Sequence, residues 1–122
     1  MLNILNTLTR LTGTLMNKVQ AGQMFDQALA LFQAQEYKAA LPLMKEAAEK
    51  GSPFAMAHLG VMAMKGLGMP CDWKKAAELM GMTIRLENYQ GTHFSTTMLK
   101  SNIGMIHAIG GYGLKQIGRA HV

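Results

Sequence analysis

The chain has 122 residues, 49% of them hydrophobic, and a single cysteine, Cys71, so we expect one domain without an internal disulfide in a reducing, cytoplasmic location. Its net charge of +5 comes from the two ends, because residues 26–87 contain seven acidic and seven basic side chains. No helix face carries a stripe of Lys and Arg with interleaved aromatic residues, so the composition disfavours binding to nucleic acid through the basic ends, our third hypothesis for the function.

Residues 1–20 are predicted to form an amphipathic helix, and residues 1–22 a separate N-terminal unit. Apolar side chains recur at the helical period on one face, at Ile4, Leu8, Leu11, Leu15 and Val19. The segment never has more than two apolar residues in a row, so we expect neither a secretion signal nor a transmembrane segment. Arg10 and Lys18, without any acidic residue, leave a transit-peptide or membrane-surface role open. We favour a packed helix that covers the open end of the domain, because helical arrays need caps.

Residues 23–50 are predicted to form the first of two helical hairpins. The first helix is almost wholly apolar and ends in a polar turn. The second helix follows from Tyr37, and Pro42 lies close enough to its start that the missing amide matters little. Lys38-Ala39 precedes Lys75-Ala76 by 37 residues, a period typical of helical-repeat arrays.

Residues 53–87 are predicted to form the second hairpin. Gly60, in the middle of the first helix, is expected where a larger side chain would block a helix crossing. Gly66-Leu67-Gly68 ends this helix, because glycine adopts the left-handed conformation of a C-cap without steric cost. Asp72 is a suitable N-cap for the second helix, as Ser52 is for the first.

The residues that define this hairpin are Ala55-x3-Leu59-Gly60, Gly66-x-Gly68, Asp72 and Lys75-Ala76. In spacing and order they resemble the Sel-one-like repeat, a relative of the tetratricopeptide repeat. Ala63 stands where that family usually has tyrosine, and Met69 where it usually has valine. The resemblance covers about residues 23–114 and implies an all-α fold, a short α-solenoid of antiparallel helical hairpins, to which this chain adds its N-terminal amphipathic helix.

A third, incomplete copy of the hairpin is predicted after the polar, turn-rich residues 88–95. Leu99-x3-Ile103-Gly104 repeats the spacing around Gly60, and Gly111-Tyr112-Gly113-Leu114 repeats the glycine turn. No Asp and Lys-Ala pair follows, so we expect a lone helix from about 96 to 110 and a C-terminal tail over residues 115–122.

Residues that usually carry catalytic or metal chemistry are scattered along this chain. The four histidines lack metal-ligand spacing to cysteine or carboxylates. The Gly66-x-Gly68 turn lacks the third glycine and the preceding strand of a dinucleotide-binding loop. Cys71 and His58 could face each other across the second hairpin, but no third orienting group is evident. We therefore predict no enzyme, no cofactor and no metal.

The leading hypothesis, implied by the resemblance, is a non-enzymatic adaptor or scaffold that binds a protein partner through the concave face formed by the first helices. Taking Ala28, Gly60 and Gly104 as equivalent positions places an apolar groove at Phe25, Leu29, Phe32, Phe54, Ala57, Val61, Met64, Ser101 and Met105. Its expected occupant is a helix or peptide of a partner, a second copy of the chain in a homo-oligomer, or residues 1–20.

The alternative hypothesis is a small neutralising or regulatory protein, such as an immunity protein that binds a bacterial toxin. A short helical array with little else attached suits that role, and a neighbouring toxin-like reading frame would favour it. The twelve methionines suit irregular core gaps or an adaptable binding groove, and we favour the core.

Overall fold

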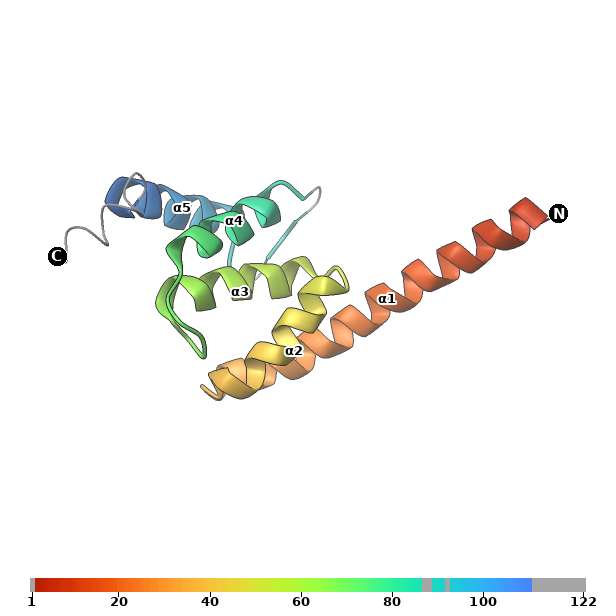
Figure 1. Ribbon diagram of the computed structural model, residues 1–122, viewed down its shortest axis with the longest axis horizontal. Helices are drawn as coiled ribbons and strands as arrows, with labels where there is room; N and C mark the ends of the chain where they lie inside the picture. Colours follow the sequence, from red (N-terminus) through yellow and green to blue (C-terminus); the bar gives the residue numbers. More distant parts are fainter. Residues whose placement is uncertain (1, 87–88, 92, 111–122) are drawn as a thin grey trace.

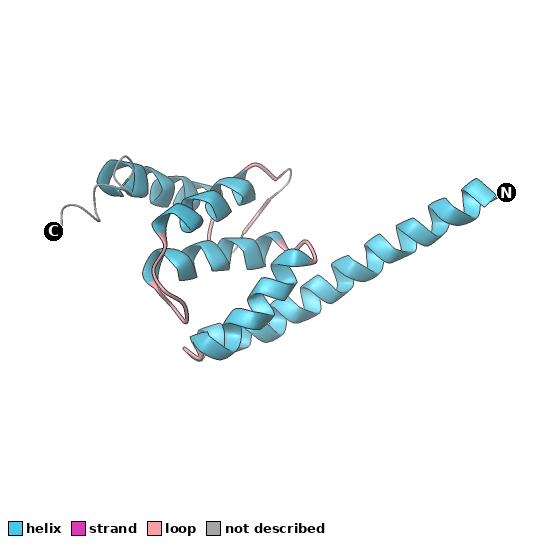
Figure 2. Cartoon of the chain, viewed as in Figure 1, coloured by secondary structure: helices cyan, strands magenta, loops and turns pink. Residues whose placement is uncertain are grey.

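The computed structural model describes residues 2–86, 89–91 and 93–110, and the regular secondary structure over these residues consists of helices joined by loops (Figure 2). The helices are α1 (Leu2–Gln33), α2 (Tyr37–Glu49), α3 (Pro53–Lys65), α4 (Trp73–Ile84) and α5 (Thr96–Gly110). The prediction of an all-α fold is confirmed. The glycine-rich residues 111–114 and the tail over residues 115–122 lie outside the described residues.

Each helix packs against its neighbour in sequence, as the hairpin pattern predicts (Figure 1). The pairs α1–α2 and α3–α4 form the two hairpins, and α2–α3 and α4–α5 contacts join them in series. This sequential packing is the arrangement of a short helical-repeat array.

The ends of α3 and α4 are set by the local hydrogen bonds that the sequence indicates. The Ser52 hydroxyl accepts the amide of Ala55 at 3.1 Å, and the Asp72 carboxylate accepts the amide of Lys75 at 3.0 Å. Gly66 closes α3 in the left-handed conformation, with a φ of 71°. The turn that follows packs against the start of α2, since a Cβ atom on Gly68 would lie 2.6 Å from the carbonyl oxygen of Tyr37.

Helix α3 lies between two apolar clusters and is buried on both faces. One cluster joins it to α1 and α2 and contains Phe25, Ala28, Met44, Ala47, Ala55, Leu59 and Met62. The other joins it to α4 and α5 and contains Ala57, Val61, Ala63, Ala76, Met80, Leu99 and Ile106. Three methionines, one on each of α2, α3 and α4, are fully buried and so fill the core.

Helix α1 differs from the expected pair of helices, because it continues through Gly22 without a break. Every side chain described between residues 3 and 20 is exposed, and Ala21 is the first buried one. The 13-residue helix α2 is about 20 Å long and therefore covers only the C-terminal part of α1. The N-terminal part projects away from the other helices (Figure 1), so the expectation that residues 1–20 cover the open end of the domain is wrong for this conformation.

Gly104 also differs from expectation. Its position was expected to repeat the close packing at Gly60, but Gly104 is exposed and a Cβ atom there would meet nothing within 4 Å. Helix α5 instead packs through Leu99 and Ile106, which are fully buried. The spacing repeats in the sequence, but α5 has no following helix among the described residues against which a glycine seam could pack.

We predict opposite effects of Gly60→Ala and Gly104→Ala on stability. A Cβ atom at Gly60 would lie 2.9 Å from Cγ of the fully buried Met80, so overpacking of about 1–3 kcal/mol exceeds the gain in helix propensity of about 1 kcal/mol. At Gly104 only the gain remains. Thermal or urea unfolding should show Gly60→Ala less stable than the parent and Gly104→Ala equally or more stable. Equal destabilisation by both variants would instead show that Gly104 is packed as closely as Gly60.

We predict that removal of residues 1–18 leaves the free energy of unfolding of the rest unchanged. The deleted side chains that are described contact solvent, whereas Gln20, which accepts a hydrogen bond from Lys50 at 3.1 Å, is retained. Thermal unfolding followed by circular dichroism measures the effect. A large drop in the midpoint, or aggregation of the shortened chain, would mean that this segment covers apolar surface in solution.

Candidate functional site

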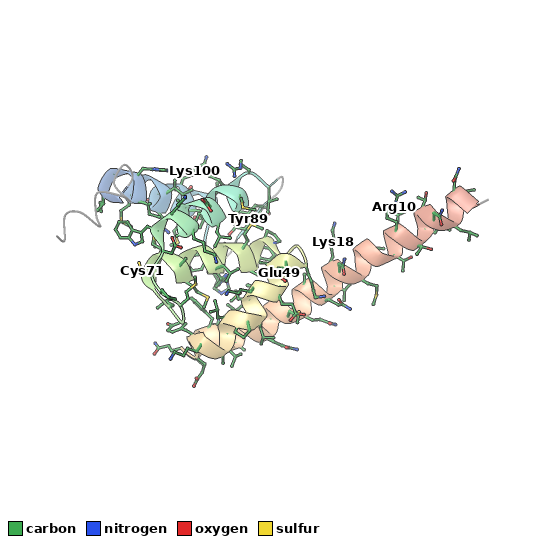
Figure 3. The ribbon with its side chains drawn as sticks, viewed as in Figure 1. Arg10, Lys18, Glu49, Cys71, Tyr89 and Lys100 are labelled. Atoms are coloured by element: carbon green, nitrogen blue, oxygen red, sulfur yellow. The ribbon has the colours of Figure 1, made fainter. Side chains whose placement is uncertain are left out.

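A pocket of about 340 Å³ with aromatic walls lies between α1, α3 and the segment that joins α4 to α5. Tyr89, labelled in Figure 3, belongs to that joining segment. The pocket is lined by Gly22, Phe25, Asp26, Leu29, Phe54, His58, Tyr89, Gln90, Gly91, His93 and Phe94. Aromatic rings from three parts of the chain therefore meet around one hollow.

His58 is the buried polar group of this pocket, with 2% of its surface exposed. Its Nδ1 atom lies 2.8 Å from the carbonyl oxygen of Phe54, one turn earlier on α3. A carbonyl oxygen only accepts hydrogen bonds, so Nδ1 carries the proton in the neutral ring. Nε2 is then an acceptor, and it is buried without a hydrogen-bond partner among the described residues.

Four aromatic rings surround His58. The ring centroid of Phe94 lies 4.7 Å from that of His58, and those of Phe32, Phe25 and His93 lie at 5.1, 5.2 and 5.6 Å. All four contacts are edge-to-face, the geometry that aromatic pairs prefer. The imidazole is thus held in one orientation by packing as well as by its hydrogen bond.

Burial lowers the pKa of His58 below its ordinary value of 6.5. The hydrogen bond to Phe54 opposes this shift, and the neighbouring His93 adds to it, because a second positive charge would be repelled. The ring is therefore neutral at pH 7, which keeps Nε2 available as an acceptor.

The joining segment is closed by Tyr89, whose hydroxyl donates a hydrogen bond to the carbonyl of Phe94. Burial raises the pKa of this phenol, so it stays protonated and able to donate. A Cβ atom on Gly91 would collide with the Tyr89 hydroxyl and the Phe94 carbonyl. The absence of a side chain at Gly91 is what allows this closure.

An exposed apolar stripe runs along the projecting part of α1. Its members are between 54% and 63% exposed: Ile4, Leu8, Leu11, Leu15 and Val19. Threonines on the same segment bond back to their own helix, as Thr12 does to the carbonyl of Leu8 at 2.8 Å. None of the described helices is long and apolar enough to cross a bilayer.

The stripe and the pocket lie on the same face of α1. Ile4 is 18 residues before Gly22, and Leu11 is 18 residues before Leu29. Because about 18 residues make five turns of an α-helix, each pair falls on one line along the helix. The apolar stripe therefore leads directly to the pocket wall.

The residues predicted to form one groove are divided in the structure. Phe25, Leu29 and Phe54 line the pocket, and Phe32 packs against His58 beside it. Ala57 and Val61 are buried in the cluster shared by α3, α4 and α5, and Met64 packs against that cluster. Ser101 and Met105 are exposed on α5. A role in partner binding stays a prediction for the pocket members and for the exposed pair, whereas Ala57 and Val61 are core residues.

The pocket could not be predicted from the sequence pattern because five of its eleven lining residues come from the connection after α4. Residues 88–95 were expected to be only a polar turn. The available signal was the pair Tyr89 and Phe94, since two aromatic residues are unusual in a segment that is otherwise polar. That they meet α1 depends on how the two hairpins stack, which no local pattern specifies.

Cys71 and His58 make separate hydrogen bonds rather than one to the other. The Cys71 thiol donates to the carbonyl of Met64 at 3.2 Å, while His58 is bonded to Phe54. No three His, Cys, Asp or Glu side chains in the described ranges are grouped closely enough to hold a metal ion. A second hollow, of about 380 Å³, lies between α2, α3 and α4, and Lys45, Glu49 and Lys75 are among its lining residues.

Comparison with known proteins gives no match to this chain. No protein-family model matches it, and none of the curated proteins or solved structures is significantly similar to it. The function is therefore inferred from the geometry of the chain itself.

We predict that neutral His58 makes the stability of the protein depend on pH. In the unfolded chain this group titrates near 6.5, while its folded pKa is lower, so between the two values the unfolded state binds more protons. The contribution of neutral His58 to stability is full above pH 6.5 and is lost as the pH falls through the folded pKa. Asp26 and His93 line the same pocket, so the comparison needs a variant at position 58.

Urea unfolding of the parent and of His58→Gln at pH 7.5 and pH 5 measures this dependence. The parent should lose more of its free energy of unfolding between the two pH values than the variant, which has nothing to protonate at position 58. The same loss in both proteins would show that His58 is not the group responsible.

Proposed function

We propose that this protein is a non-enzymatic interaction module that binds an amphipathic helix of a partner protein along the apolar stripe of α1. The observation that supports this most is that a stripe of large apolar side chains from Ile4 to Val19 is exposed on a helix that projects from the domain. Exposed apolar surface of this extent on an otherwise charged or polar segment is typical of an interaction site. A straight stripe at helical spacing fits a second helix.

The charge of the projecting segment favours a partner over a second copy of this chain. Arg10 and Lys18 are its charged side chains, and Asp26 is the first acidic residue of the sequence. Two such segments would meet without any opposite charge, whereas a partner helix with acidic residues beside its apolar face would be complementary.

The same composition disfavours a lipid surface as the binding partner. Helices that lie on anionic membranes are rich in Lys and Arg on their polar face and carry Trp or Phe on the other. Here the polar face consists mostly of Thr and Asn, and residues 2–20 contain no aromatic side chain. Two cations add only about 2 kcal/mol of attraction to anionic lipid.

The resemblance to the Sel-one-like repeat supports the same class of function. Members of that family are scaffolds built from helical hairpins, and the series α1–α2, α3–α4 agrees with that architecture. We propose membership of this family on the Gly60, Gly66-x-Gly68 and Asp72 pattern of the second hairpin.

We predict that Leu15→Asp weakens partner binding at least tenfold and that Asn17→Asp does not. Both positions are exposed and one turn or less apart, but Asn17 faces away from the stripe, so the two variants add the same charge to opposite faces. Partners recovered with the tagged full chain should be purified and titrated against all three proteins by calorimetry. Circular dichroism checks that the fold is unchanged.

Three other results would contradict this proposal. Equal affinity of Leu15→Asp and the parent would place the interface elsewhere. Concentration-dependent dimers in sedimentation velocity, lost in Leu15→Asp, would identify a second copy as the occupant. Co-sedimentation with phosphatidylserine vesicles at physiological salt would identify a lipid surface.

A further inference from the structure

We propose that the pocket beside His58 is a binding site for an aromatic ring that carries an N–H or O–H donor, the chemistry shared by indole and phenol. The site is defined by the geometry around His58 and does not depend on a partner helix bound along α1. Its ring could come from a free small molecule or from a tryptophan or tyrosine side chain, and the experiment below separates the two sources.

The hydrogen-bonding state of His58 specifies a donor on the ligand. Nδ1 is occupied by the Phe54 carbonyl, so the free position on the ring is the Nε2 lone pair. A buried acceptor without a partner is destabilising, and a donor placed next to it removes that penalty. A ligand that can only accept would leave Nε2 unsatisfied.

The walls of the pocket specify a planar ring. Phe25, Phe54 and Phe94 line it. Phe25 and Phe54 form a tilted pair, and Phe94 packs edge-to-face on His58, so a further ring can add to these contacts. A volume of about 340 Å³ is at the lower end of the range of ligand pockets, so one ring or two fused rings fit better than a larger molecule.

The rim of the pocket specifies where polar groups of the ligand can lie. Asp26 and Gln90 line the pocket and are exposed, so they contact both the hollow and solvent. A carboxylate at the rim disfavours an anionic substituent and tolerates a neutral or positive one. The expected ligand is therefore uncharged or cationic, with its donor-bearing ring turned inward to His58.

The test compares indole with 1-methylindole, in which the donor is replaced by a methyl group. Calorimetry or ligand-observed NMR with the full-length protein should give indole at least about tenfold higher affinity, since one hydrogen bond distinguishes the two. Indole should also shift the ¹⁵N resonance of His58 Nε2 in the direction of hydrogen bonding, and 1-methylindole should not. Phenol and anisole form a second pair with the same expected order.

Two variants assign the effect to His58. His58→Phe keeps a ring in the cage but removes the acceptor, so indole and 1-methylindole should bind with equal affinity. His107→Phe makes the same change at an exposed position on α5, away from the pocket, and should leave the preference for indole intact. If His58→Phe does not fold, the preference of the parent and the ¹⁵N shift of His58 decide the question.

N-acetyl-tryptophanamide distinguishes the source of the ring. Binding comparable to that of indole shows that the pocket accepts a side chain with its backbone attached, whereas binding of indole alone identifies a free small molecule. The proposal is overturned if neither indole nor phenol binds at millimolar concentration, if the methylated compounds bind equally well, or if the preference survives in His58→Phe.

Discussion

The contact between α3 and α4 at Gly60 is the constraint on which the rest of the structure depends. A Cβ atom there would lie 2.9 Å from Cγ of Met80 and 3.5 Å from the carbonyl oxygen of Ala76, so Met80 packs into the space that a side chain at position 60 would need. This contact buries one face of α3, and α1 and α2 bury the other. A helix buried on both faces has no freedom to rotate, so its polar residue, His58, is fixed in position.

The position of His58 on this helix explains why an apolar core contains an imidazole. The ring lies at the edge of the first core cluster, where α1 approaches the connection between α4 and α5. Its Nδ1 is satisfied within α3 itself, by the carbonyl one turn earlier, so no other helix is needed to accept that proton. Nε2 has no such local partner. A purely structural residue at this position would be better as leucine or phenylalanine, because neither leaves a buried acceptor unsatisfied.

Features that depend on residues close together in the sequence could be predicted, and features that depend on contacts between distant segments could not. The N-caps Ser52 and Asp72 and the end of α3 at Gly66 depend on residues within one turn, and they were predicted correctly. The continuity of α1 through Gly22 was not, because a glycine in a helix is weakly unfavourable and the neighbouring residues decide the outcome. The equivalence of Gly104 with Gly60 failed because a glycine seam exists only where a second helix packs against it. The pocket was missed for the same reason, since its walls come from segments that meet only when the hairpins stack.

The two surfaces on α1 are mechanically linked because they belong to one uninterrupted helix. A molecule bound along the stripe would lie on the line that continues to Gly22 and Leu29 at the pocket wall, with Asp26 beside it at the rim. Gly22 has no side chain and has open space around its Cα, so no side chain blocks the path where the stripe meets the pocket. A helix docked on the stripe could thus extend one large side chain over Gly22 toward His58. The apolar stripe would then accept partner helices of many sequences, because apolar contact is not directional. The single acceptor at Nε2 would select among them, because it requires a donor at one position.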